Sequence, residues 1–276
     1  MKKIITLLLV LFFAVQSADS QDLITPKKTK NYFEIDVSGG FCLPVMDLAG
    51  SQDLMGFWNF YNYGMSSGFG TTINTKMSVY TTKMTQLRIY LLLGYTHFSK
   101  EENAAYSVGV VNYGWPSNIA GGTVPYNPVK TTGTSYLRLN MPNMSFGLEY
   151  GIYTDRKNTS SFNFGGDFST HIITGRAYEI VGFSGETFNT IKSSLRFGFG
   201  VNISYSYKFD NYVGFHVGTR FTMPNLFGKS SEITDEPGYI YLLDKEHSVL
   251  NPLLSSNRTM AYLNFFGGMS FYIGKK

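Results

Sequence analysis

The chain has 276 residues, of which 43% are hydrophobic, 16% aromatic and 15% charged, and its formal net charge is +4. This length fits a single domain, and so small a positive charge gives no reason to expect a nucleic-acid partner. Cys42 is the single cysteine, which excludes an intrachain disulfide. Many aromatic residues, 29 glycines and few charges are typical of strands that face lipid.

Residues 1–20 have the three parts of a secretory signal peptide. Lysines at the second and third positions form the positive start, an apolar run follows over residues 4–15, and small residues precede the cut. An apolar run of this length is too short to cross a bilayer as a helix. We expect cleavage before Gln21, with cleavage after Ser17 as the alternative, and residues 21–31 would then form a periplasmic tail.

Beyond the signal, no stretch reaches the roughly 18–20 apolar residues that a membrane helix requires. Instead, eight segments alternate in hydrophobicity with a period of two, which predicts β-strands. They are residues 32–43, 67–80, 84–99, 135–153, 159–172, 191–208, 211–222 and 258–274. The links between them are alternately long and short, as in outer-membrane barrels, where long loops lie outside and tight turns lie in the periplasm.

The sixth segment shows the alternation most clearly, from Leu195 to Tyr207, with small and polar residues on its second face. In a soluble sandwich the apolar face would be core, whereas in a membrane barrel it would meet lipid. Long strands, glycines on the polar face and the alternating link lengths favour the barrel. We therefore predict an all-β fold, an eight-stranded antiparallel up-and-down transmembrane β-barrel over residues 32–276, with both mature termini in the periplasm.

The fourth segment changes phase midway. Its apolar residues are odd-numbered from Leu137 to Met141 but even-numbered from Phe146 onward. A β-bulge adds one residue and resets the phase, and proline is tolerated there. We therefore predict a bulge near Pro142 and Asn143.

Three stretches carry motifs of a known family. The run from Leu195 to Phe227 contains a glycine-rich strand, the turn Lys208-Phe209-Asp210-Asn211 and the run Gly214-Phe215-His216-Val217-Gly218. The stretch from Tyr136 to Pro142 and the closing run from Phe265 to Phe271 are of the same kind. Through these motifs the chain resembles the porin-family, OmpA-like outer-membrane β-barrel domain of Gram-negative envelopes. It departs from that family at Lys275-Lys276, where members often end on an aromatic residue. The resemblance implies a location and a fold, with outer-membrane lipid as a partner, and no particular activity.

The inward faces of the predicted strands carry charges of both signs. Those expected to form a lumen network are Glu34, Asp36, Lys76, Arg88, Glu149, Asp167, Arg196 and Arg220, with Arg138 as a further inward base. An eight-stranded barrel is just wide enough for side chains to fill it, and buried charges must be paired. We expect a structural salt-bridge network, with a narrow ion path as the alternative. Counting equally back from the centre of the Tyr80–Met84 turn places Lys76 opposite Arg88, so that an acid, Glu34 or Asp36, must lie near them.

His97 and Ser99 are predicted to point outward at the outer rim, with Glu101 and Glu102 just beyond. A histidine beside a serine, with an acid near by, can activate a hydroxyl nucleophile, and outer-membrane lipid A deacylases resemble this arrangement. The residues that follow Ser99 do not match that family, so we expect no catalytic residue here. None of the four histidines lies in a metal-binding motif, so no metal or cofactor is expected.

Aromatic residues are concentrated in two of the long links. The first link contains Trp58 and Tyr61, and the link after the third segment contains Tyr113 and Trp115. Exposed aromatic clusters mark contact surfaces, although rings that pack on one another would be shielded. We expect a non-enzymatic outer-membrane protein whose extracellular loops carry a structural, adhesive or partner-binding role. The alternatives are porin-like or hydrophobic-solute passage and, third, lipid A modification at the outer rim.

Overall fold

The computed structural model describes residues 33–49, 65–108, 129–181, 185–232, 236–242, 244–245 and 257–273. The predicted signal peptide, the tail and the loop residues Trp58, Tyr61, Tyr113 and Trp115 lie outside these ranges and stay predictions. Within the described ranges no helix is long and apolar enough to cross a membrane.

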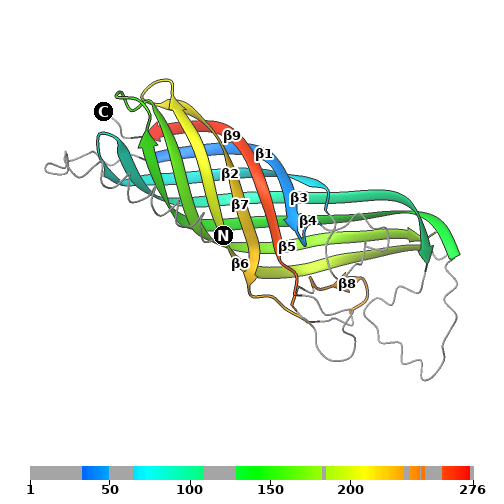
Figure 1. Cartoon of the computed structure of the whole chain (residues 1–276). Coiled ribbons are helices and arrows are strands. Elements are labelled where there is room, and N and C mark those ends of the chain that lie inside the picture. Colours follow the sequence, from blue (N-terminus) through cyan, green and yellow to red (C-terminus); the bar gives the residue numbers. More distant parts are fainter. Residues whose placement is uncertain are drawn as a thin grey trace, which may run out of the picture.

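Eight long strands form a closed antiparallel ring in which each strand pairs with its neighbours in the chain (Figure 1). They are β1 (Phe33–Met46), β2 (Ser67–Thr81), β3 (Thr85–Val108), β4 (Val129–Tyr153), β5 (Ser160–Val181), β6 (Gly185–Lys208), β7 (Val213–Phe227) and β9 (Met260–Ile273). The first and last of them, β1 and β9, pair along their whole length and close the ring. A two-residue strand, β8 (Tyr239–Ile240), runs parallel to β6 at its outer end. The predicted eight-stranded up-and-down barrel is confirmed.

The two faces of each strand differ in the way the period of two predicts. On β4, Met144, Phe146 and Leu148 are 53%, 60% and 54% exposed on the outside, whereas Ser145 and Glu149, which occupy alternate positions, are buried inside. The same apolar exterior continues around the ring. A wide exposed apolar surface is unfavourable in water but stable in hydrocarbon, and ring closure pairs the backbone groups that lipid cannot satisfy. The chain is therefore a transmembrane barrel.

The short turns all lie at one end of the barrel. Residues 82–84, 154–159 and 209–212 connect β2 to β3, β4 to β5 and β6 to β7. The described ends of the chain lie on the same side, since Phe33 pairs with Ile273 and Tyr272 donates its backbone N–H to the carbonyl of Tyr212. Short turns mark the periplasmic side.

At the opposite end, β3, β4, β5 and β6 project as a curved sheet beyond the other strands (Figure 1). They have 22 to 25 residues each, whereas β1, β2, β7 and β9 have 14 or 15. Pairing of β3 with β2 begins at Ser99, and pairing of β6 with β7 ends at Phe197. The parts of the sheet beyond these residues stand above the closed ring.

The bulge predicted at Pro142 and Asn143 is wrong. Pro142 pairs with Tyr95 of β3 without a shift, and the register with β5 is the same at Asn140 and at Asn143. The apolar residues from Leu137 to Met141 change phase because they point into the barrel, where they are buried. Register shifts occur instead at Ser78/Tyr80 of β2, Ile173/Gly175 of β5 and Phe197/Phe199 of β6.

Asp155 organises the turn between β4 and β5. Its carboxylate accepts hydrogen bonds from the backbone N–H groups of Ser160 (2.8 Å), Thr159 (2.9 Å) and Lys157 (3.1 Å) and from the hydroxyls of Thr159 and Ser160. The bond from the Ser160 backbone, followed by the other hydrogen bonds, lowers the pKa of Asp155 from 3.8 to about 2. The turn is therefore held most firmly when this group is ionised.

Replacing Asp155 by alanine should lower the free energy of unfolding at neutral pH, because the turn loses these acceptors. The folded pKa lies below the ordinary value, so the contribution is complete above about pH 4 and is lost as the pH falls through about 2. Urea-induced unfolding in lipid vesicles, measured across this range, should show the two proteins converging at low pH. Lys157→Ala in the same turn is the control. Its difference in free energy of unfolding from the unaltered protein should not change as the pH falls. A difference that does not change with pH would contradict the prediction.

Candidate functional site

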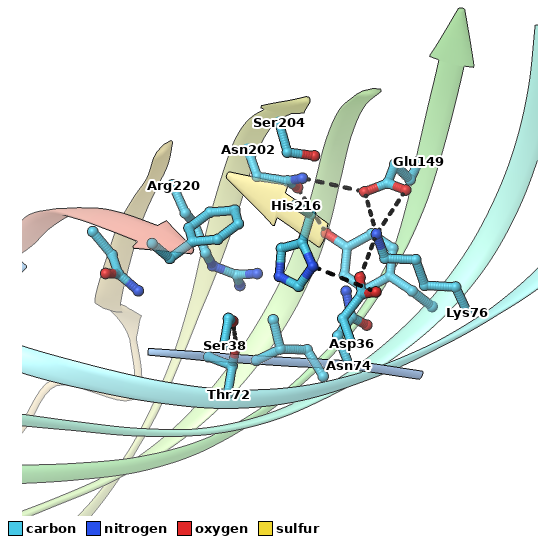
Figure 2. A pocket seen from close by; sticks show the side chains of 14 residues that line it. Asp36, Ser38, Thr72, Asn74, Lys76, Glu149, Asn202, Ser204, His216 and Arg220 are labelled. Atoms are coloured by element: carbon cyan, nitrogen blue, oxygen red, sulfur yellow. Dashed lines mark hydrogen bonds and ion pairs between the residues drawn. The ribbon is translucent and has the colours of Figure 1, made fainter. Parts of the chain in front are cut away.

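Lys76 is the centre of an ion-pair network inside the barrel (Figure 2). Its Nζ atom lies 2.8 Å from Oδ2 of Asp36, 3.1 Å from Oε1 of Glu149 and 3.9 Å from Oε1 of Glu34. The strand pairing explains the grouping, because Glu34 of β1 lies directly opposite Lys76 of β2, with Asp36 two residues farther along the same inward face. All four side chains are buried.

Arg88 is the second cation of this network. It forms ion pairs with Glu34 and with Glu149, which lies directly opposite it on β4, and donates to Oδ1 of Asn163 at 2.8 Å. Glu34 and Glu149 thus each bridge Lys76 and Arg88. The low dielectric of the interior strengthens such bonds, and sharing satisfies more than one charge with each group.

The sequence predicted that Lys76 and Arg88 lie opposite each other, and this prediction is wrong. Lys76 pairs with Tyr90 and Arg88 pairs with Ser78, because the turn is centred between Lys83 and Met84, where Thr81 pairs with Gln86, and not at Thr82. The shift between Ser78 and Tyr80 recovers only one residue of this difference. This offset avoids two like charges facing each other directly. The acids expected near the two cations are both present, as Glu34 and Asp36.

A second pair continues the polar lining of the lumen. Arg220 of β7 lies 2.7 Å from Oδ1 of Asp167 on β5, and the hydroxyl of Tyr90 donates to Oδ2 of the same carboxylate at 2.6 Å. Nδ1 of His216 lies 2.9 Å from Oγ of Ser270 and 3.7 Å from Oδ1 of Asp36. A small polar cavity between the two groups is lined by residues of both (Figure 2).

Arg196 lies apart from these groups. Its Nε and Nη2 atoms each lie 2.8 Å from Asp244, which also accepts from Nδ2 of Asn225 and from the backbone N–H of Ser230. Asp244 is fully buried, although it belongs to a long link in which no strand pattern could reveal it. Arg138, by contrast, is exposed on the outside, so its predicted inward position is wrong.

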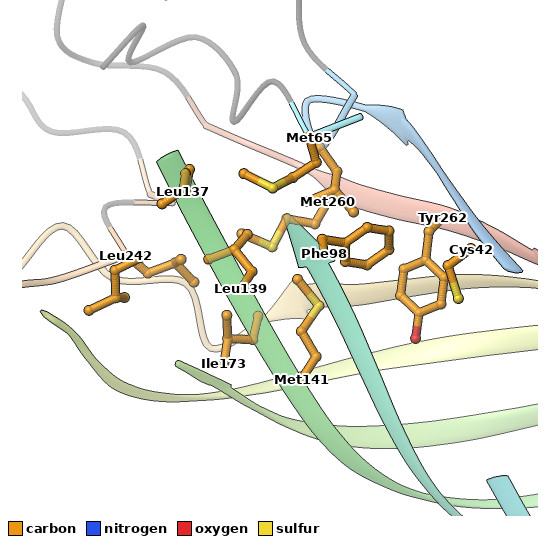
Figure 3. Close-up of a cluster of buried hydrophobic side chains, with 12 residues drawn as sticks. Cys42, Met65, Phe98, Leu137, Leu139, Met141, Ile173, Leu242, Met260 and Tyr262 are labelled. Carbon is orange, nitrogen blue, oxygen red and sulfur yellow. The ribbon is translucent and has the colours of Figure 1, made fainter. Parts of the chain in front are cut away.

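A buried apolar cluster fills the outer end of the lumen (Figure 3). It is formed by Cys42, Leu48, Met65, Phe98, Leu137, Leu139, Met141, Ile173, Ile191, Leu242, Met260 and Tyr262. The cluster was not predicted from the sequence, because the changed phase of the fourth segment was the feature that indicated it and this was interpreted as a bulge. Apart from the Cys42 thiol and the Tyr262 hydroxyl, which lies 3.3 Å from Oγ1 of Thr96, the cluster offers only apolar atoms to a solute.

His97 and Ser99 both point outward from β3, as predicted, but the structure gives His97 an unexpected partner. Oδ1 of Asn140 accepts from Nδ1 of His97 at 2.8 Å and from the hydroxyl of Tyr95 at 2.7 Å. No hydrogen bond joins His97 to Ser99 within the described residues. The site therefore has an oriented imidazole without the serine contact that nucleophilic catalysis requires. In the described part of the chain, no group of three or more His, Cys, Asp or Glu is placed to hold a metal ion.

No family model and no curated protein matches this chain. Similar solved structures include Ail, the attachment invasion locus protein of Yersinia pestis, with 7% identity and a TM-score of 0.34 over 87% of this chain and 99% of that chain. Neisserial surface protein A has 14% identity and a TM-score of 0.31, over 88% of this chain and 97% of that chain. The outer membrane protease OmpT of Escherichia coli has 11% identity and a TM-score of 0.35, over 90% of this chain and 96% of that chain. The strand order and the apolar exterior of the chain itself, rather than these low scores, define it as an eight-stranded outer-membrane β-barrel protein.

Replacing Lys76 by methionine should lower the free energy of unfolding by about 3–5 kcal/mol, because three buried carboxylates lose a shared cation. The measurement is urea-induced unfolding in lipid vesicles at neutral pH. Lys83→Met, in the exposed turn between β2 and β3, is the matched control and should change the free energy by less than about 0.5 kcal/mol. An equal effect of the two substitutions would show that the network is not needed for stability.

Proposed function

We propose that this chain is a non-enzymatic outer-membrane barrel whose projecting outer end serves a structural, adhesive or partner-binding role. The observation that supports this most directly is the double obstruction of the lumen. The ionic network around Lys76 lies toward the short-turn end of the barrel, and the apolar cluster around Leu139 lies above it. The two layers differ in chemistry, so no single kind of solute is compatible with both.

Passage of solutes is the less favoured role for this reason. A hydrated ion would lose water at the apolar cluster, where the Tyr262 hydroxyl and the Cys42 thiol are the polar groups of its members, and would have to separate buried charge pairs below it. A hydrophobic solute could pass the apolar cluster but would be stopped by the buried charges around Lys76 and Arg88, which it cannot solvate. An eight-stranded barrel has no spare width to let either bypass the side chains.

The projecting sheet gives the outer end a surface suited to contacts. A transmembrane strand needs about 9–11 residues, so the strands β3 to β6 carry about ten or more residues each beyond the bilayer. The two links with the predicted aromatic contacts, Trp58 and Tyr61 and then Tyr113 and Trp115, leave the barrel at this end. A broad sheet that projects above the membrane provides the area that binding another molecule requires.

In planar lipid bilayers the protein should produce no stepwise ion conductance. The reason is that both layers of the lumen must open together before ions can pass. A variant that weakens both layers, with Leu139→Ser, Met141→Ser and Arg88→Ala, should conduct if it folds, and each single substitution should not. Regular conductance steps from the unaltered protein would replace this proposal with the transport role.

Lipid A modification is a second candidate, supported by the bond that orients His97 toward Asn140. The candidate is weaker because an amide cannot stabilise a protonated imidazole as a carboxylate does. Ser99→Ala should leave lipid A acylation unchanged in mass spectra of outer membranes that contain the variant. His97→Ala is the companion variant with the same expected result. Deacylation that depends on Ser99 would overturn the non-enzymatic proposal.

A further inference from the structure

Two arginines lie side by side on the outer wall of the barrel. Arg138 of β4 and Arg176 of β5 are directly paired across the two strands, and both side chains are exposed. Directly paired side chains in an antiparallel sheet have Cβ atoms about 4.5–5.5 Å apart. The same row continues to Ser99 of β3 on one side and Thr190 of β6 on the other.

The height of the pair matches the headgroup region of the membrane. On β5 the apolar exterior ends at Ile172, four residues before Arg176, and on β4 it ends at Met144, with Pro142 and Asn140 between it and Arg138. Four residues span about 13 Å and six about 20 Å along a strand, or about 10–15 Å along the barrel axis at the usual tilt. The guanidinium groups therefore start just above the hydrocarbon, on the side opposite the short turns.

A polar group lies directly below the pair. His97, Asn140 and Tyr95 are joined by hydrogen bonds through Oδ1 of Asn140, and the ring of Phe69 lies 5.2 Å from the ring of His97. These contacts hold the imidazole against the wall at the upper border of the apolar belt. The wall thus offers hydrogen-bonding groups on two consecutive rows of outward-facing residues.

We propose that Arg138 and Arg176 bind a phosphate group of lipid A in the outer leaflet, with His97 at the lower edge of the site. Each guanidinium has five N–H donors in a planar fork, so a pair can serve an anion in addition to partners within the protein. Arginine matches phosphate oxygens in a bidentate way. Phosphate groups of the outer leaflet lie at this height, and the acyl chains of the same lipid would cover Met144 and Phe146 below.

The test uses the full chain in phosphatidylcholine nanodiscs, to which bisphosphorylated lipid A or the same lipid without phosphates is added. Native mass spectrometry then counts bound lipid A. The unaltered protein should bind the phosphorylated form at least about tenfold more tightly, since each cation near the surface adds a substantial attraction. Arg138→Gln with Arg176→Gln should remove this preference. Lys83→Gln with Arg156→Gln, which removes two exposed charges from the short turns, should retain it.

Two comparisons keep the result decisive. Arg138→Lys with Arg176→Lys retains the charge but not the forked donors and should bind with intermediate strength, which also covers the event that the glutamine variant does not fold. Inorganic phosphate should not displace lipid A, because the acyl chains contribute to binding. Equal binding of both lipid forms by the unaltered protein, or displacement by free phosphate, would overturn the proposal. Neither result depends on whether the lumen conducts.

Discussion

Lys76 and Arg88 pair with three carboxylates inside a closed ring of strands, two of which they share, and the register of half the barrel depends on this network. Glu34 and Asp36 come from β1, Lys76 from β2, Arg88 from β3 and Glu149 from β4. A one-residue slip of any of these strands would turn its charged side chains into lipid and its apolar side chains inward. Since an unpaired buried charge is very costly, the network selects one register, in addition to what hydrophobicity alone specifies.

Most of the membrane-spanning fold could be predicted from the sequence, because lipid outside and polar side chains inside impose a period of two on every strand. The strand pairs, their direction and the inward position of Lys76 and Arg88 follow from that rule. The offset between these two residues does not, because it depends on the residue at which the turn after β2 closes and on the extra residue near Val79. The pairing of Arg196 with Asp244 could not be predicted either, because Asp244 belongs to a long link that has no repeating sequence pattern.

The failure at Leu137 to Met141 has a physical cause that is informative about the membrane. Within lipid, apolar residues point outward; above lipid, the exterior meets water and the apolar residues turn inward to form an ordinary core. The chain does not shift its register to make this change, since Pro142 pairs in phase with its neighbours. The rule that apolar residues point outward holds only within lipid, and above the lipid its reversal has the same sequence pattern as a bulge.

The position of this reversal therefore marks the outer border of the hydrocarbon on β3 and β4. On β3 it falls between Tyr95, which is exposed outside, and Phe98, which is buried inside; on β4 it falls between Met141 inside and Met144 outside. Because Tyr95 pairs with Pro142, the two borders meet at the same level. The barrel is thus a membrane protein below this line and has the core of a soluble β-protein above it. Apolar packing at the outer end closes the lumen with side chains of the barrel strands and their links. The alternate residues of the same strands face outward, where they can carry polar groups at the height of the lipid headgroups.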